Sequence, residues 1–310
     1  MTNFMEIGPF DVFGKPRKLT WLNQVDLLFI DSPLGTGMSS TVPSAWPTSS
    51  DTIVKHLLQV LVDVCKEVPE LRGRRLLLGG ESYGAQPVLG LGAKIVSDKW
   101  KRMKLHGVII SGGVVDFKHI AASYVPFLQD QGRAVNTMFK AVKEALNGKS
   151  VYNYQKPVQI DYTGYWSEND TLKRLSMKEI MKRVPPSFFK DYPNRAQYTI
   201  SWHHSVIFDT IKPMLNEGKA IVNSGVKLSI VSGDLDVLVN SYAADTVASA
   251  IRPGQETIPF EEIGDHNGTL KVLKKTVDNL LYVWRVPSSG HYLSIDSPES
   301  AYRILSEILQ

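Results

Sequence analysis

Cysteine is nearly absent from this sequence of 310 residues, in which Cys65 is the only one. One thiol cannot form a disulfide within the chain, so a fold held together by internal disulfides is excluded. Cys65 lies in an apolar stripe with helical spacing, and we interpret it as a small buried hydrophobic residue. A single thiol is compatible with a reducing compartment without establishing one.

Long hydrophobic runs are also missing. The most apolar stretches, 57–65 and 107–115, are far shorter than the roughly 20 residues that a membrane-spanning helix needs, so we expect no membrane span. The first ten residues contain no basic stretch followed by an apolar one, so the sequence shows no signal peptide. Two Asn-x-Thr sequons, at Asn169 and Asn267, point weakly toward a glycosylated and therefore secreted protein.

Neither sign of charge predominates. The chain has 35 basic and 31 acidic residues, and its 43% of hydrophobic and 21% of charged residues are ordinary for a globular protein. The densest basic stretches, 99–104 and 271–275, are interleaved with apolar residues. This pattern indicates solvated faces of helices or strands, and we expect no nucleic-acid partner.

Short apolar runs alternate with helical patterns along the chain. Such alternation predicts an α/β domain with a mostly parallel central sheet that is covered by helices on both faces. A mostly helical and amphipathic stretch interrupts the pattern, and we expect it to form a helical cap at about 120–215, inserted into a single domain that spans 1–310. The predicted strands are 25–31, 74–79, 105–112, 227–233 and 279–286, and the predicted helices include 51–68, 87–96 and 298–310.

The pentapeptide Gly-Glu-Ser-Tyr-Gly at 80–84 is typical of a catalytic serine. It follows the predicted strand 74–79 and precedes the predicted helix 87–96, which is the setting of a nucleophile elbow. Glycines on both sides of Ser82 suit a tight turn from which the hydroxyl group protrudes. The plainer alternative is that Ser82 is an ordinary turn serine.

A nucleophilic serine needs a base, and the base needs an acid that orients it. Asp236, in Ser-Gly-Asp-Leu-Asp, follows the predicted strand 227–233, and His291, in Ser-Ser-Gly-His, follows the last predicted strand. The chain order of serine, aspartate and histidine is that of α/β hydrolases, whose catalytic groups collect at the carboxyl ends of the strands. Asp234 competes with Asp236 for the acid, and a structural histidine and a capping aspartate are the alternatives without a catalytic role.

Five blocks of the sequence resemble the serine carboxypeptidase family. Three of them, 80–84, 232–236 and 290–299, are similar to its catalytic signatures, and 6–10 and 25–40 are similar to two further blocks. The stretch 8–21 is especially similar to the retinoid-inducible serine carboxypeptidase branch. The match follows the family's order over nearly the whole chain, so the resemblance implies an α/β-hydrolase fold with a helical cap insertion. Because the chain starts after the family's Gly-Gly-Pro-Gly block, we expect the first strands of the sheet to be missing.

The resemblance also implies a role for each site residue. Ser82 would be the nucleophile, His291 the base and Asp236 its orienting acid, while the N–H group of Tyr83 would donate to the oxyanion. Glu81 and Glu6 match carboxylic acids that hold the terminal carboxylate of the substrate. Only a protonated carboxyl group can donate to a carboxylate, so we expect activity to be favoured by acid. As alternatives, Glu81 could be a turn residue and Glu6 a solvated side chain.

The implied activity is that of an exopeptidase. It would release C-terminal residues from peptides or protein C-termini through an acyl-enzyme, with no metal or organic cofactor. The adjacent His203 and His204 have no carboxylate or cysteine at ligand spacing and predict no metal site. A homodimer is compatible with the sequence, and the resemblance implies a lysosomal, vacuolar or secreted protein.

Three departures from the family pattern leave alternatives open. The absent Gly-Gly-Pro-Gly block would supply a second oxyanion donor, Tyr292 stands where a methionine usually follows the histidine, and 38–40 differs from a Phe-Ser-Tyr-like segment. Substrate preference therefore stays open. The two rival functions are a truncated or non-catalytic scaffold and an acyltransferase of the same family.

Overall fold

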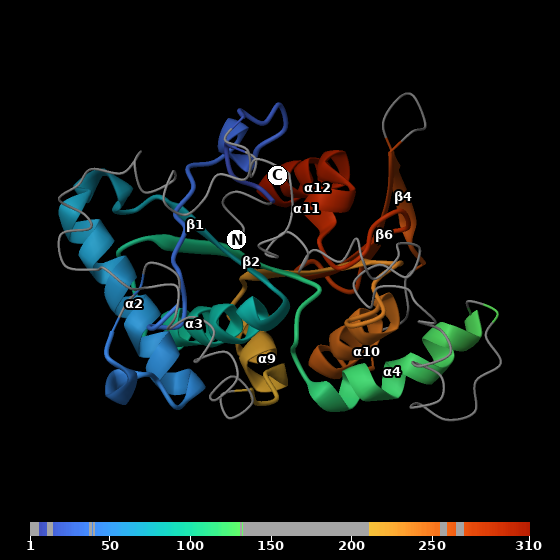
Figure 1. Cartoon of the computed structure of the whole chain (residues 1–310), viewed down its shortest axis with the longest axis horizontal. Helices are drawn as coiled ribbons and strands as arrows, with labels where there is room; N and C mark the ends of the chain where they lie inside the picture. The colour runs from blue at the N-terminus through green and yellow to red at the C-terminus, as the bar shows by residue number, and fades with distance from the viewer. Residues whose placement is uncertain are drawn as a thin grey trace, which may run out of the picture.

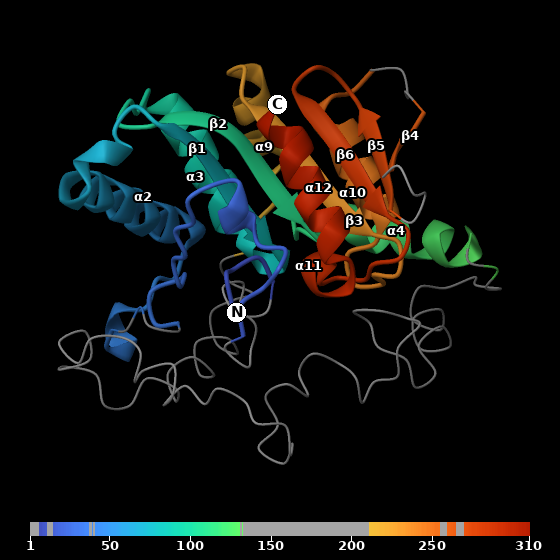
Figure 2. The ribbon, with the colours of Figure 1, turned by 90° about the horizontal axis from the view of Figure 1, so that it is seen from above.

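The computed structural model describes residues 6–10, 15–36, 39, 41–130, 132, 211–254, 259–264 and 270–310. Six strands form one sheet in the order β1-β2-β3-β6-β5-β4, with helices on both faces, which confirms the predicted α/β class (Figures 1 and 2). The neighbours β1, β2, β3 and β6 are parallel, and β5 and β4 continue the sheet in antiparallel pairing.

The strands are β1 (Arg75–Glu81), β2 (Lys104–Ser111), β3 (Lys227–Gly233), β4 (Glu261–Gly264), β5 (Lys271–Thr276) and β6 (Leu281–Val286). The α-helices are α2 (Ser50–Glu67), α3 (Ala85–Ser97), α4 (Phe117–Asp130), α9 (Leu215–Asn223), α10 (Ser241–Ile251), α11 (Leu293–Asp296) and α12 (Pro298–Leu309), and the short 3-10 helices are η1 (Trp21–Asn23), η2 (Pro43–Ala45), η3 (Pro69–Leu71) and η4 (Ser82–Gly84).

The apolar strands bury side chains on both faces of the sheet, because successive residues of a strand point to opposite sides. Val108 and Ile110 of β2 belong to a cluster with α2, α3, α9 and α10, whereas Ile109 between them packs with α12. Likewise, Leu281 of β6 belongs to the cluster with α2, and Trp284 of the same strand packs with α12. Figure 1 shows α2, α3, α9 and α10 on one face and α11 and α12 on the other.

The helix predicted at 51–68 is confirmed as α2. Its N-cap is Ser49, whose side chain accepts a hydrogen bond from the N–H of Thr52. Ile53, Leu57 and Cys65 are buried at helical spacing, so the interpretation of Cys65 as a core residue is confirmed. None of the helices that the structure describes combines the length and the apolar character needed to span a bilayer.

The prediction of a strand at 25–31 is wrong. Within the described residues, β1 pairs only with β2, and no ladder joins 25–31 to the other edge of β1. The segment instead passes this edge from one face of the sheet to the other, since Val25 packs with the α12 cluster and Ile30 with the α2 cluster (Figure 1). An ion pair between Asp26 and Arg74 (2.6 Å) ties it to the start of β1. An apolar run forms a strand only where a neighbouring strand pairs with its backbone.

The antiparallel strands β4 and β5 are absent from the predicted set. The lysines at 271–275 made this stretch resemble a solvated face, yet β5 lies between β4 and β6 in the sheet. Lys274 places its Nζ atom 5.4 Å from the centre of the Trp284 ring, and Lys275 donates to Asp245 (2.9 Å). The lysine side chains therefore cover the sheet while their charged ends find partners.

The described residues contain little of the predicted cap. Helix α4 begins at Phe117 and packs against α10, and the Tyr124 hydroxyl donates to the Leu238 carbonyl oxygen (2.9 Å). Residues 133–210 lie outside the described residues, as do the sequon asparagines Asn169 and Asn267 and the pair His203-His204. The cap at 120–215 and the single domain over 1–310 stay predictions.

Two leucines test where the core lies. Leu228 in β3 is 0% exposed and Leu28 is 54% exposed. We expect Leu228→Ala to lower the free energy of unfolding by about 2–5 kcal/mol, because it leaves a cavity in the packed core, and Leu28→Ala to change it by less than about 0.5 kcal/mol. Urea denaturation of both variants measures the difference, and similar shifts for the two would contradict the packing described here.

Candidate active site

The turn after β1 has the strained geometry of a nucleophile elbow. Ser82 follows the strand directly and has φ = 53°, a left-handed conformation that is uncommon for a residue with a side chain. A Cβ atom on Gly80 would overlap the Gly84 carbonyl oxygen, which explains the first glycine of the motif. Gly84 has open space around its own missing Cβ, so crowding does not explain the second glycine.

His291 and Asp236 form a buried pair. The Nδ1 atom of His291 lies 2.7 Å from Oδ2 of Asp236, and the two residues are 2% and 0% exposed. The other carboxylate oxygen, Oδ1, accepts hydrogen bonds from the N–H groups of Leu238 (2.8 Å) and Val239 (3.1 Å), which fixes the orientation of the carboxylate. Burial lowers the pKa of His291, but the charge of Asp236 and its hydrogen bond outweigh burial, so this pKa is raised above its ordinary value.

Asp234, the competing aspartate, has a different partner. Its Oδ1 atom lies 2.9 Å from Nε of Arg285 in β6. The two aspartates are two residues apart in the sequence, and Asp236 is the one hydrogen-bonded to the histidine at 2.7 Å. The contacts therefore distinguish two carboxylates that spacing alone left in competition.

The loop at 112–114 joins the serine and the histidine. The N–H group of Val114 donates to the Ser82 carbonyl oxygen (3.0 Å). Gly112 has φ = 50°, and a Cβ atom there would lie 2.9 Å from Nδ1 of His291 and 3.4 Å from Oδ2 of Asp236. The parallel strands β1, β2, β3 and β6 thus bring Ser82, Asp236 and His291 to the carboxyl ends of the strands, around this loop. The predicted site residues do not include this loop, although the Gly-Gly pair after a predicted strand is a signal of close backbone approach.

Two carboxyl groups, one on a half-buried residue and one on a buried residue, lie beside the elbow. Glu81 is the last residue of β1, and burial raises its pKa well above the ordinary value, with further increases from the charge of Glu6, a hydrogen bond to Glu6 and the charge of Asp236. Glu6 is 7% exposed, so the alternative of a solvated side chain is wrong. Within the described residues, Oε1 of Glu81 is buried without a hydrogen-bond partner.

Contacts with residues 15–21 hold the segment that carries Glu6. Thr20 donates its hydroxyl hydrogen to the Ile7 carbonyl oxygen (2.7 Å), and Trp21 donates its N–H to the same oxygen (3.1 Å). Arg17 donates its N–H to the Pro9 carbonyl oxygen (2.8 Å). These contacts hold in place the irregular segment next to Glu6, whose carboxyl group lies close to Glu81.

Tyr83 lies in the single turn η4 between Ser82 and α3, with its side chain packed against the α2 cluster. Its N–H group therefore belongs to the same turn as the serine, as the motif predicts. Among the described residues, no three His, Cys, Asp or Glu side chains gather as a metal site would require. That the chemistry needs no metal or organic cofactor stays a prediction.

The fold is that of an α/β hydrolase. A crystal structure of a prohormone-processing carboxypeptidase from Saccharomyces cerevisiae, Kex1, superimposes with a TM-score of 0.69, covering 99% of this chain and 79% of that one at 21% identity. At this identity the likeness concerns the fold. It confirms the predicted fold class.

The chain belongs to the serine carboxypeptidase family, whose model matches residues 1–186 and 163–310. Serine carboxypeptidase-like 51 of Arabidopsis thaliana is 23% identical, covering 99% of this chain and 81% of the relative. Retinoid-inducible serine carboxypeptidase of Mus musculus is 22% identical, covering 98% of this chain and 79% of the relative. The predicted resemblance, including that to the retinoid-inducible branch, is confirmed.

The raised pKa of His291 gives a direct test of the buried pair. In Asp236→Asn the negative charge is lost while burial remains, so we expect the pKa of His291 to fall below its ordinary value of 6.5. NMR titration of the imidazole resonances measures this, with His291→Gln identifying which resonance belongs to His291. The control Asp234→Asn removes a carboxylate that pairs with Arg285, and the His291 pKa should then stay raised. Equal shifts in both aspartate variants would contradict the assignment of Asp236.

Proposed function

We propose that this chain is a serine carboxypeptidase, an exopeptidase that releases C-terminal residues from peptides. The observation that supports this most strongly is the buried pair of His291 and Asp236 beside a serine held at φ = 53° in a strand-turn-helix elbow. Family membership supports the same conclusion, because the relatives that match include proteins named as serine carboxypeptidases. The substrate would be the C-terminus of a peptide or protein.

The first half of the proposed reaction forms the acyl-enzyme. Oγ of Ser82 attacks the carbonyl carbon of the last peptide bond while Nε2 of His291 takes the hydroxyl proton. Asp236 accepts the Nδ1–H hydrogen bond and stabilises the imidazolium. The carbonyl electron pair moves to oxygen, where the N–H of Tyr83 donates to the oxyanion. The C–N bond then breaks, and His291 returns the proton to the leaving amino group.

The second half repeats these steps with water. His291 removes a proton from a water molecule, which attacks the ester carbonyl carbon and forms a second tetrahedral intermediate. When this collapses, the bond to Oγ breaks and His291 returns the proton to Ser82. The shortened peptide then leaves with a new terminal carboxylate.

Glu81 and Glu6 would select the terminal carboxylate of the substrate. An ionised glutamate would repel that group, whereas a protonated Glu81 donates a hydrogen bond to it. The raised pKa of Glu81 keeps this carboxyl group protonated at pH values where an exposed glutamate is ionised. The site would therefore discriminate a free C-terminus from an internal peptide bond.

Two ionisations act on the rate in opposite directions. Below the pKa of His291 the base is protonated and cannot accept the serine proton, and above the pKa of Glu81 the carboxyl donor is lost. Both pKa values are raised. Because the pKa of His291 is raised, the rate begins to fall at a pH closer to neutrality as the solution is made more acidic. The preference of the activity for acid is therefore weaker than the ionisation of Glu81 alone would give. The location, glycosylation and oligomeric state expected from the resemblance stay predictions.

Replacement of the nucleophile tests the proposed reaction. We expect Ser82→Ala to lower the release of the C-terminal residue from a blocked dipeptide by at least about 10³-fold, because no acyl-enzyme can form. It should also abolish covalent labelling by a phosphonate, detected as a mass increase. The control is Ser97→Ala, because Ser97 is exposed at the far end of α3. This variant should still release the C-terminal residue and still be labelled by the phosphonate.

Three results would contradict this proposal. A folded parent chain that neither labels nor releases a residue would favour the scaffold. Labelling followed by transfer of the acyl group to an added alcohol, with no hydrolysis, would favour the acyltransferase. Equal release by Ser82→Ala and the parent chain would place the nucleophile elsewhere.

Glu81→Gln tests carboxylate recognition. The amide donates a hydrogen bond at every pH and cannot ionise. In the parent chain, we expect kcat/KM to fall as pH rises through the raised pKa of Glu81, and in Glu81→Gln this fall should vanish while the rise caused by His291 remains. Steady-state rates across pH measure both limbs, with the exposed Glu70→Gln as control. A descending limb that persists unchanged in Glu81→Gln would contradict the role of Glu81.

A further inference from the structure

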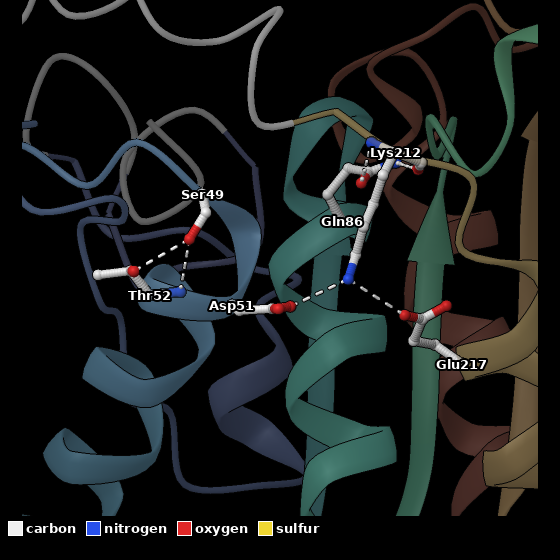
Figure 3. Close-up of polar contacts among 6 residues, drawn as sticks. All are labelled: Ser49, Asp51, Thr52, Gln86, Lys212 and Glu217. Atoms are coloured by element: carbon white, nitrogen blue, oxygen red, sulfur yellow. Dashed lines mark hydrogen bonds and ion pairs between the residues drawn. The ribbon is translucent and has the colours of Figure 1, made fainter.

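Gln86 is fully buried in the first turn of α3, one helical turn beyond Ser82. Its Nε2 group donates to the carbonyl oxygens of Val114 (2.7 Å) and Lys212 (2.9 Å), and its Oε1 accepts a hydrogen bond from the N–H of Lys212 (3.3 Å). Figure 3 shows the carboxamide beside the main chain of Lys212. One buried amide thus uses both of its donors and its acceptor on main-chain groups of two segments far apart in the sequence.

Val114 connects Gln86 to the turn that carries Ser82. The carbonyl group of Val114 accepts from Gln86, and its N–H group donates to the Ser82 carbonyl oxygen (3.0 Å). A Cβ atom on Gly113 would lie 2.8 Å from Cβ of Ala85, so this loop is packed tightly against the start of α3. Gln86 therefore holds the 112–114 loop against the elbow.

Lys212 supplies a second anchor for the same loop. The chain continues from Lys212 to Met214, whose N–H donates to the Val115 carbonyl oxygen (2.9 Å). The Lys212 ammonium group also pairs with Asp51 (3.0 Å) and Glu217 (3.4 Å), which Figure 3 shows on either side of it. The Lys212 and Asp51 side chains are 41% and 77% exposed, so these ion pairs hold the segment weakly and the buried amide is the stronger tie.

We infer that Gln86 is a positioning residue, whose carboxamide fixes the 112–114 loop and, through it, the separation of Ser82 from His291. Gly112 in this loop lies against the imidazole ring, and Val114 binds the serine turn, so a shift of the loop would move the nucleophile relative to its base. The catalytic consequence rests on the proposed function. A misplacement of about 1 Å between reacting groups can lower a rate about 10²-fold.

Gln86→Met tests this positioning role. Methionine has a similar length but leaves Val114 and Lys212 without their side-chain partners. We expect kcat to fall about 10²-fold and KM to change by less than about two-fold, because alignment and not substrate affinity is lost. The matched control Lys212→Met removes the ion pairs and keeps the main-chain bonds to Gln86, so its kcat should stay within about two-fold of the parent value. An unchanged kcat in Gln86→Met, or a change in KM alone, would overturn the inference.

Gln86→Glu decides the question if Gln86→Met does not fold. A protonated glutamate has one donor and one acceptor for these main-chain groups, whereas an ionised one has no donor for the two carbonyl oxygens. Relative to the parent chain, kcat of Gln86→Glu should therefore fall as pH rises through the pKa of the new carboxyl group and recover when the pH is lowered. A pH profile of the same shape as that of the parent would overturn the inference.

The NMR signals of His291 separate this inference from the proposed function. A parent chain that neither releases a residue nor reacts with the phosphonate would contradict the proposed function alone. The imidazole resonances would still report the loop, because Gly112 lies against the ring. We expect them to shift in Gln86→Met, and in Gln86→Glu between low and high pH, but not in Lys212→Met. Resonances that stay unchanged in both Gln86 variants would overturn the inference.

Discussion

The close approach of the backbone at the end of β2 is the constraint on which the site depends. Gly112 donates its N–H to the Val231 carbonyl oxygen of β3 (2.9 Å), and two residues later Val114 binds the serine turn. The imidazole of His291 occupies space that a side chain at 112 would fill. Three neighbouring strands are therefore held in register at their carboxyl ends by one short loop, and the proposed nucleophile and base both take their positions from it.

Burial of ionisable groups is the second constraint, and each group compensates for it differently. Asp236 accepts hydrogen bonds from two backbone N–H groups and the imidazole, so its loss of water is offset by fixed donors. Glu81 has a charged neighbour in Asp236 and a carboxyl neighbour in Glu6, which favour its neutral form. The site thus places Glu81, whose protonated form is favoured, beside the hydrogen-bonded pair of His291 and Asp236. This contrast between neighbouring carboxyl groups is the pattern expected where a proton must be both donated and accepted.

The sequence predicted those parts of the molecule that depend on local pattern. The helical spacing of Ile53, Leu57 and Leu61 predicted α2, and the five-residue motif predicted the elbow at Ser82. The sheet edge was predicted less well, because whether 25–31 forms a strand depends on a neighbour that the run itself does not specify.

The rest of the site depends on contacts between distant residues. Asp234 pairs with Arg285 and Asp236 with His291, each partner more than fifty residues away in the chain, and residues 17–21 contact the segment next to Glu6. Gln86 carries no recognisable pattern at all, since its partners Val114 and Lys212 are defined only by the fold. Such contacts have no periodicity and no fixed spacing, so inspection of one sequence does not reveal them.

The position of β6 also has a consequence for biosynthesis. Of the six strands that the structure describes, β6 is the last along the chain, yet it lies between β3 and β5. While the chain emerges from the ribosome, β3 is completed some fifty residues before β6. Until β6 is made, the edge of β3 that pairs with β6 has no partner. The strands β4 and β5 then have no connection to the rest of the sheet, because β5 joins it through β6. An unpaired apolar strand edge is prone to self-association, and here the edge stays unpaired until about nine-tenths of the chain has been made. Any premature stop before β6 would remove His291 and leave that edge permanently open.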